Sequence, residues 1–221
     1  LPDRVYSLRT IEASTEQRRL SDEITEGIRS KITEGNLDTS NILNASQKLA
    51  QIPGGFIYGK KHTQFLDNPK GKELEKVLDE IDGKVIIFHE YQAEGKIIED
   101  ICKKKKLKFA SMRAEIKDTH TEYEKFKYDD SIRVLVAHPL SGGIGLNFQD
   151  ICNVVIFYSN GYSGPTIREQ CEGRIYRQNQ KNKCLFIDLV MLNSIDERKL
   201  QVLQNKQDMA KAVLDYLKEQ K

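Results

Sequence analysis

The chain has 221 residues, 38% of them hydrophobic and 31% charged, a composition typical of a folded globular protein and not of a disordered one. Its 35 basic and 33 acidic residues give a formal net charge of +2, which neither demands nor excludes a nucleic-acid partner. Because no apolar run approaches the roughly 18 residues that a membrane span needs, we expect no membrane partner.

The chain contains four widely spaced cysteines and no CxxC pair: Cys102, Cys152, Cys171 and Cys184. A zinc site is therefore not expected, and such cysteines are typical of reduced thiols in an intracellular protein. The amino terminus shows neither a signal-peptide pattern nor an initiator Met. We therefore expect an intracellular, cytoplasmic protein of which this sequence is a fragment.

Helical periodicity dominates the first third of the chain. Leu20, Ile24, Ile28 and Ile32 fall on one stripe, which predicts a helix over 15–33. Weaker patterns predict the next three elements: a short helix over 42–51, a strand over 56–58, and a helix from Pro69 that stops at Gly83.

From residue 84 onward, strand patterns alternate with helical patterns. The expected strands are 84–88, 107–111, 133–137, 154–158 and 184–190, and the expected helices are 92–105, 119–127, 166–176 and a long one from 194. The run KVIIF at 84–88 is continuously apolar, as in strands buried on both faces. The alternation predicts an α/β fold with a parallel sheet and helices on both faces. We expect an N-terminal helical segment over 1–67 and the main domain over 68–221.

A glycine-rich segment, SGGIGLNF at 141–148, directly follows one of the expected buried strands. Glycines allow the backbone to turn tightly and to approach a phosphate closely. Loops at the carboxyl ends of parallel strands are also where such sheets bind ligands. By itself the segment is equally consistent with a purely structural turn.

A second segment, QCEGRIYRQNQ at 170–180, places Gln170, Arg174 and Arg177 four and three residues apart. On a helix this spacing puts one amide and two guanidiniums on a single face. Two such groups suit a polyphosphate, and an arginine can stabilise the charge that develops in phosphoryl transfer. A solvated charged face is the alternative interpretation.

Together, the two segments resemble motifs V and VI of superfamily-two helicases, most closely those of the Swi/Snf-type branch. That family shows A-G-G-x-G-L-N-L, a strand, a short Trp- and Pro-rich loop, and Q-x-x-x-R-x-x-R-x-x-Q. This chain has SGGIGLNF, VVIFY, NGYSGP and QCEGRIYRQNQ in the same order. KVIIFHEYQ at 84–92 resembles motif IV, and residues 194–197 resemble the family's T-I-E-E turn. His138-Pro139 stands where the family often has Ser-Thr, and Tyr162 where it has Trp.

The resemblance implies the second RecA-like lobe of a compact, phage- or bacterial-type ATP-dependent DNA translocase or helicase. Such a protein is an ATP hydrolase, but this fragment alone is expected to be inactive. ATP and Mg²⁺ would be held mainly by the first lobe of the same chain, with no metal ligands here. Arg174 and Arg177 would act as arginine fingers across the cleft, and Gly143, Gly145 and Gln170 would also contact the nucleotide.

The resemblance also implies duplex DNA as the partner, contacted through its phosphates. The candidate contact residues are His138, Pro139, Ser141 and Lys108. Two alternatives remain open: a non-catalytic RecA-like module that binds nucleic acid or protein, and a helicase that separates strands.

Two further segments have compositions that also occur at phosphate-binding sites. Gly54–Lys61 fits G-x-x-x-x-G-K, but it lacks the final Ser or Thr and no buried strand precedes it, so we do not expect a phosphate loop there. The lysine run Lys103–Lys106 suits the end of a helix, and a nucleic-acid contact is the alternative. The four histidines show no ligand spacing, and acidic residues near strand ends, such as Asp188, are expected to support the fold.

Overall fold

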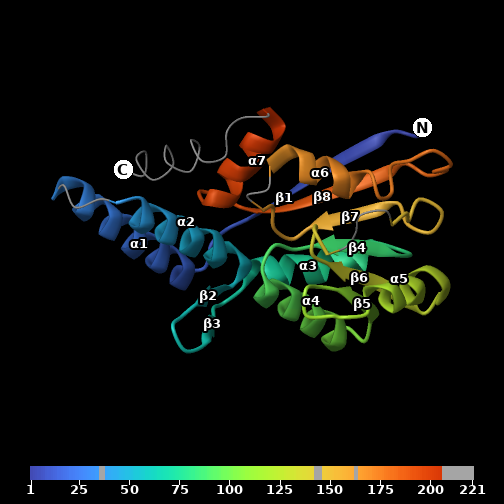
Figure 1. The fold of residues 1–221 in the computed structure, drawn as a ribbon, viewed down its shortest axis with the longest axis horizontal. Coiled ribbons are helices and arrows are strands. Elements are labelled where there is room, and N and C mark those ends of the chain that lie inside the picture. Colours follow the sequence, from blue (N-terminus) through green and yellow to red (C-terminus); the bar gives the residue numbers. More distant parts are fainter. Residues whose placement is uncertain (35–37, 142–145, 162–163, 206–221) are drawn as a thin grey trace.

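The computed structural model describes residues 1–34, 38–141, 146–161 and 164–205. In these residues, six strands form one sheet in the order β1-β8-β7-β4-β6-β5, and all neighbouring strands run parallel. Helices pack on both faces of this sheet (Figure 1). The expected α/β architecture is therefore confirmed.

The strands, including a separate hairpin of β2 and β3, are β1 (Arg4–Ile11), β2 (Phe56–Tyr58), β3 (Thr63–Phe65), β4 (Val85–Phe88), β5 (Lys108–Met112), β6 (Ile132–Ala137), β7 (Val154–Phe157) and β8 (Cys184–Met191). The helices are α1 (Thr15–Thr33), α2 (Thr39–Gln51), the short 3-10 helix η1 (Ile52–Gly54), α3 (Pro69–Glu80), α4 (Gln92–Lys104), α5 (Thr119–Tyr128), α6 (Gly164–Glu172) and α7 (Ile195–Asn205).

The central strand β4 is buried on both faces, as its continuous apolar run predicts. Val85 and Ile87 belong to the core beneath α3 and α4, whereas Ile86 and Phe88 belong to the core beneath α5 and α6. Each fully buried side chain of this kind contributes about 1.5–3 kcal/mol to folding. The alternation along β4 therefore joins the two helical layers through one strand.

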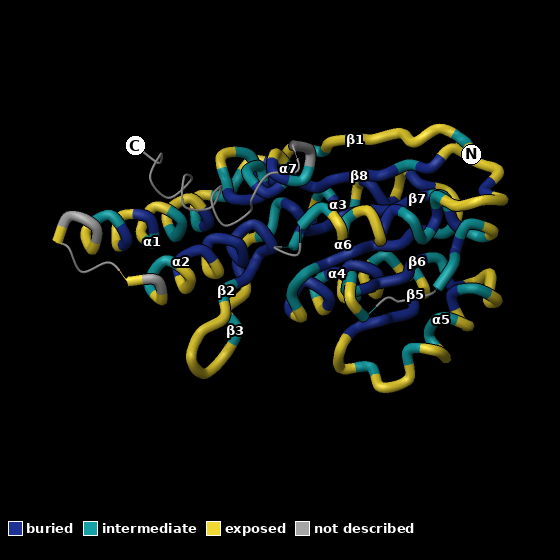
Figure 2. Tube along the Cα trace, turned by 45° about the horizontal axis from the view of Figure 1, so that its top comes forward, coloured by how far each residue is buried: buried dark blue, intermediate teal, exposed yellow. Residues whose placement is uncertain are grey.

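Strand β1 was not expected, since the first third of the sequence was interpreted as helical. It pairs in parallel with β8 along its whole length. Because β1 is an edge strand, much of it is exposed, including Tyr6 and Leu8, and it lacks the continuous apolar run of a central strand (Figure 2). The expected boundary between 1–67 and 68–221 stays a prediction, although β1 belongs to the main sheet.

Helices α1 and α2 form the expected N-terminal helical segment, which extends away from the sheet (Figure 1). Helix α2 begins after Asp38, whose side chain accepts a hydrogen bond from the backbone N–H of Asn41. The buried side chain of Gln17 on α1 donates to the carbonyl oxygen of Ile52 at 2.8 Å, which ties α1 to the end of α2.

Two helix ends differ from expectation or extend beyond what is described. Helix α6 ends at Glu172 and not at Tyr176, because Gly173 weakens the helix and the backbone then continues as turns. The carbonyl oxygen of Arg174 instead accepts a hydrogen bond from the N–H of Phe148 at 2.9 Å. Helix α7 is described to Asn205, and the rest of the expected C-terminal helix, 206–221, lies outside the described residues.

Candidate functional site

The carboxyl ends of the six parallel strands meet at one edge of the sheet, where α/β folds bind ligands. His89, Arg113 and His138 directly follow β4, β5 and β6 at this edge. The backbone N–H of His89 donates to Ala137, and that of His138 donates to Met112, at 3.1 and 3.0 Å. The loops that follow three neighbouring strands are thus tied together at the predicted site.

Of the glycine-rich segment at 141–148, the structure describes Ser141 and residues 146–148. Gly143 and Gly145 themselves fall in 142–145, outside the described residues. Before the loop, the N–H of Ser141 donates to the carbonyl oxygen of His138 at 3.1 Å. After it, Phe148 is buried and bonded to the backbone of Arg174, so the end of the loop is fixed to the segment that carries the arginines.

Arg174 and Arg177 both reach the residues just after the glycine loop. The guanidinium of Arg174 donates to the carbonyl oxygen of Leu146 at 3.4 Å, and that of Arg177 donates to the side-chain oxygen of Asn147. The two arginines lie in the turns after α6, so the expectation that they share one helical face with Gln170 is wrong. The fold nevertheless brings the two sequence motifs together.

The electrostatics of the arginine pair favour an external anion. Burial, with a contribution from the nearby positive charge of Arg177, holds the pKa of Arg174 below its usual value. Across the described parts of the chain, neither guanidinium forms an ion pair with a carboxylate, whereas Arg168 on the same segment forms two. The pair is therefore an uncompensated positive site beside the glycine loop.

The four candidate DNA contacts do not share one surface. His138, Pro139 and Ser141 are partly exposed at the carboxyl edge of the sheet. Lys108 is the first residue of β5 and therefore lies at the opposite, amino edge, where its ammonium group contacts Ser131 at 3.2 Å. A single DNA-contacting surface would include the first three residues without Lys108.

The lysine run 103–106 is largely paired. Lys103, Lys104 and Lys105 form ion pairs with Asp100, Glu75 and Asp79, at 2.8, 2.8 and 2.6 Å. These contacts favour the helix-end interpretation of the run over a nucleic-acid contact.

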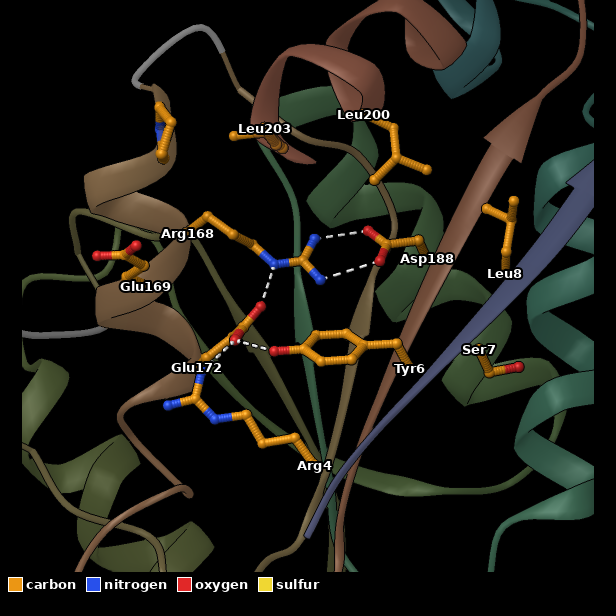
Figure 3. Close-up of a pocket in the computed structure, with 11 residues that line it drawn as sticks. Arg4, Tyr6, Ser7, Leu8, Arg168, Glu169, Glu172, Asp188, Leu200 and Leu203 are labelled. Carbon is orange, nitrogen blue, oxygen red and sulfur yellow. Dashed lines mark hydrogen bonds and ion pairs between the residues drawn. The ribbon is translucent and has the colours of Figure 1, made fainter. Parts of the chain in front are cut away.

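Sequence analysis did not identify Arg168, which fixes α6 to the sheet. Its guanidinium forms two hydrogen bonds with Asp188 on β8 and a third, of 2.8 Å, with Glu172 (Figure 3). Burial alone would lower the pKa of Arg168, but the hydrogen bonds and charges of Asp188 and Glu172 raise it. Glu172 also accepts a hydrogen bond from Tyr6 on β1 at 2.8 Å.

These side chains line a cavity of about 530 Å³ between β1, α6 and α7. As expected, Asp188 supports the fold. No sequence signal identified its partner, because the two residues lie 20 positions apart on different elements.

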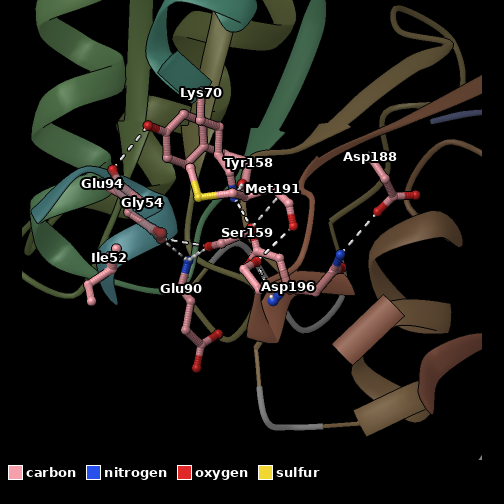
Figure 4. A network of polar contacts seen from close by, with 12 residues as sticks. Ile52, Gly54, Lys70, Glu90, Glu94, Tyr158, Ser159, Asp188, Met191 and Asp196 are labelled. Carbon is pink, nitrogen blue, oxygen red and sulfur yellow. Dashed lines mark hydrogen bonds and ion pairs between the residues drawn. The ribbon is translucent and has the colours of Figure 1, made fainter. Parts of the chain in front are cut away.

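A second missed residue is Glu94, which joins the loops after β4 and β7 (Figure 4). Its carboxylate accepts hydrogen bonds from the backbone N–H groups of Glu90 and Tyr91 at 3.0 Å and from the hydroxyl of Ser159 at 2.6 Å. Burial raises the pKa of Glu94, although these hydrogen bonds partly oppose the shift. A glutamate at the third position of a helix is a capping signal that could have indicated part of this role.

The same network reaches the N-terminal segment through Lys70 and Tyr158. The buried ammonium group of Lys70 pairs with Asp196 and donates to the carbonyl oxygen of Tyr158 at 3.0 Å. The hydroxyl of Tyr158 donates to the carbonyl oxygen of Gly54 at 3.1 Å (Figure 4). The same hydroxyl accepts a hydrogen bond from the side-chain amide of Asn68 at 2.8 Å. These contacts join α3, α7 and the end of η1 at the carboxyl edge.

The segment Gly54–Lys61 is not built as a phosphate loop. It contains the end of η1 and all of β2, and it leads into β3 and not into a helix. A phosphate loop leads into a helix, whereas this segment forms one side of a hairpin.

Among the described residues, no group of three or more His, Cys, Asp or Glu side chains has the geometry to hold a metal ion. None of the described helices is long and apolar enough to cross a membrane.

Residues 69–179, half of the chain, match the family described as "Helicase conserved C-terminal domain". The chain therefore belongs to that family. It is 29% identical over 143 residues to a protein named "Uncharacterized ATP-dependent helicase YqhH" from Bacillus subtilis. The matched region covers 65% of this chain and 25% of that protein. The chain thus spans a quarter of the length of this curated relative.

Solved structures show the same fold. The chain matches the C-terminal part of the Fun30 ATPase domain with a TM-score of 0.81 and 17% identity, over 99% of this chain and 96% of that one. It matches the Sulfolobus solfataricus SWI2/SNF2 ATPase core in complex with dsDNA with a TM-score of 0.72 and 21% identity, over 97% of this chain and 48% of that one. The RecA-like fold and the resemblance to Swi/Snf-type helicases are confirmed.

Proposed function

We propose that this chain is the second motor lobe of an ATP-dependent translocase or helicase that acts on duplex DNA. The observation that carries the proposal is the arginine pair. Arg174 and Arg177 lie beside the end of the glycine loop and form no ion pair with a carboxylate in the described residues. Two guanidiniums left without counterions at such an edge suit the phosphates of a nucleotide.

In this proposal the lobe faces a nucleotide held mainly by the first lobe of the same chain. Arg174 and Arg177 would approach the γ-phosphate and stabilise the negative charge that spreads over its oxygens, an effect of about 10³–10⁵ in rate. Gly143 and Gly145 would allow the backbone to approach the nucleotide, and Gln170 would add an amide contact. Mg²⁺ bound by the first lobe would neutralise further phosphate charge.

The proposed DNA contacts are His138, Pro139 and Ser141, with Lys108 as a separate contact at the other edge. Contacts to phosphates position a protein without reading sequence, so binding should be salt-dependent and independent of sequence. The solved relative described as a complex with dsDNA supports duplex DNA as the partner. Closure and opening of the cleft during hydrolysis would move the two lobes along one strand.

The bacterial relative supports a cytoplasmic location in a bacterial or phage-infected cell. The test of the proposal compares residues 1–221 with the full-length protein in a steady-state ATPase assay. Full-length protein should hydrolyse ATP, with stimulation by duplex DNA, and residues 1–221 alone should not. Hydrolysis by residues 1–221 alone would contradict the assignment. A full-length protein that binds DNA without hydrolysis would favour the alternative, a non-catalytic RecA-like binding module.

A further inference from the structure

The hairpin formed by β2 and β3 projects from the body of the protein (Figures 1 and 2). At its end, the backbone N–H of Gly59 donates to the carbonyl oxygen of His62 at 3.0 Å. Lys60 and Lys61 thus occupy the two central positions of a tight turn. A Cβ atom at Gly59 would lie 2.9 Å from the carbonyl oxygen of His62, so the turn depends on glycine at this position.

The tip of the hairpin carries positive charge that the described residues do not neutralise. Lys60, Lys61 and His62 are all exposed. Neither lysine forms an ion pair in the described parts of the chain, whereas Lys72 on neighbouring α3 pairs with Asp67 at 2.8 Å. The two ammonium groups at the tip are therefore available to an anion outside this chain.

The base of the hairpin is anchored beside the carboxyl edge of the sheet. The hydroxyl of Tyr58 accepts a hydrogen bond from the backbone N–H of Ala93 at 3.2 Å, in the first turn of α4. The rings of Phe56 and Tyr91 pack edge to face, with centroids 5.4 Å apart. Because α4 follows the carboxyl end of β4, these contacts hold the hairpin next to the edge that carries His138.

We propose that the hairpin tip, Lys60 and Lys61, is an additional contact for the phosphate backbone of duplex DNA. The inference rests on the proposed function and extends the DNA-contacting surface beyond the loop that follows β6. A phosphate backbone fits the tip because lysines bind phosphates as point charges, and two adjacent ammonium groups on a turn offer charge without a groove that could read a sequence. The anchored base sets the position of these charges relative to His138.

The test measures binding of the full-length protein to a labelled duplex of about 30 base pairs and arbitrary sequence, between about 50 and 200 mM salt. The double variant Lys60→Ala/Lys61→Ala should reduce the slope of log K against log salt by about 1.8, at about 0.9 for each lost phosphate contact. Its loss of affinity should then be about 12-fold larger at the low-salt end than at the high-salt end. Lys60→Arg/Lys61→Arg should keep the wild-type slope, because the charges remain.

A control of equal charge is Lys181→Ala/Lys183→Ala, whose Lys183 forms an exposed ion pair with Asp3 at 3.4 Å in the wild type. It removes the same charge from two exposed lysines that precede β8, at the opposite edge of the sheet. Both double variants should keep the wild-type melting temperature and DNA-independent hydrolysis. If the hairpin variant keeps the wild-type slope of log K against log salt, or if the control reduces that slope equally, the proposed hairpin contact is wrong. The proposed function is unaffected by either result. A wild-type protein that does not bind the duplex overturns the proposed function, and this inference with it.

Discussion

The guanidinium of Arg168 on α6 and the carboxylate of Asp188 on β8 are joined by two hydrogen bonds, of 2.6 and 2.9 Å. Both side chains are largely buried, with 11% and 7% exposed. Arg168 also bonds Glu172, the last residue of α6, two positions before Arg174. The pair thus fixes the end of the helix from which the chain continues to the arginines of the candidate site.

Arg168→Ala should therefore destabilise the protein strongly. The substitution leaves the carboxylate of Asp188 buried without its charged partner, which costs about 3–5 kcal/mol in the free energy of unfolding. Urea denaturation of the full-length protein and of the variant measures this loss.

Arg19→Ala is the matched control for that measurement. Arg19 forms an exposed ion pair with Glu23 one helical turn away, which contributes only about 0.3–0.5 kcal/mol. A loss for Arg168→Ala as small as that of the control would contradict the role assigned to the Arg168–Asp188 pair.

His89 should make stability depend on pH on the acid side. Burial, and secondly the nearby charge of His138, lower the pKa of His89 from 6.5 to about 3. Below pH 6.5 the unfolded chain binds a proton at His89 that the folded protein does not bind. Stability should therefore fall as the pH drops from 6.5 toward 3, by up to about 1.4 kcal/mol per pH unit from this residue.

The measurement is chemical denaturation of wild type, His89→Gln and His120→Gln between about pH 7 and 4. His89→Gln should show a shallower decline than wild type, because its side chain does not titrate. His120 is exposed on α5, so His120→Gln should follow wild type. An unchanged pH dependence in His89→Gln would show that His89 is not held neutral by the fold.

The sequence predicted the strands that are buried on both faces, and it missed the edge strand β1 and the end of α6. The run at 84–88 could be interpreted correctly because β4 packs against helices on both faces. Strand β1 mixes polar and apolar residues without a regular alternation at an exposed edge, and only its pairing with β8 makes it a strand. The end of α6 was misplaced because the Phe148–Arg174 hydrogen bond that accompanies it is a long-range contact.

In the candidate site, too, some residues could be predicted from the sequence and others could not. The order and spacing of the two motifs indicated that Arg174 and Arg177 belong with the glycine loop, and contacts with Leu146 and Asn147 connect them. The supporting residues Arg168 and Glu94 could not be found in this way. Their roles depend on partners from other elements, which local periodicity does not report.

In the proposed function, Arg177 acts on a phosphate and does not maintain the fold. Its side chain is exposed and donates to Asn147, so Arg177→Ala should change stability by no more than about 0.5 kcal/mol. DNA affinity should also stay near wild type. Arg177→Lys should not replace the arginine in hydrolysis, because an ammonium group lacks the planar fork that binds phosphate oxygens.

The most direct measurement is steady-state ATP hydrolysis by full-length wild type, Arg177→Ala and the control Arg19→Ala, with thermal melting of the same preparations. Arg177→Ala should melt like wild type but lose about 10³–10⁵ in the rate of hydrolysis, whereas Arg19→Ala should keep wild-type hydrolysis. Retention of more than about a tenth of wild-type hydrolysis by Arg177→Ala, far above what loss of an arginine finger allows, would contradict the account. Unfolding of Arg177→Ala would contradict it equally, since the arginine would then be a structural residue.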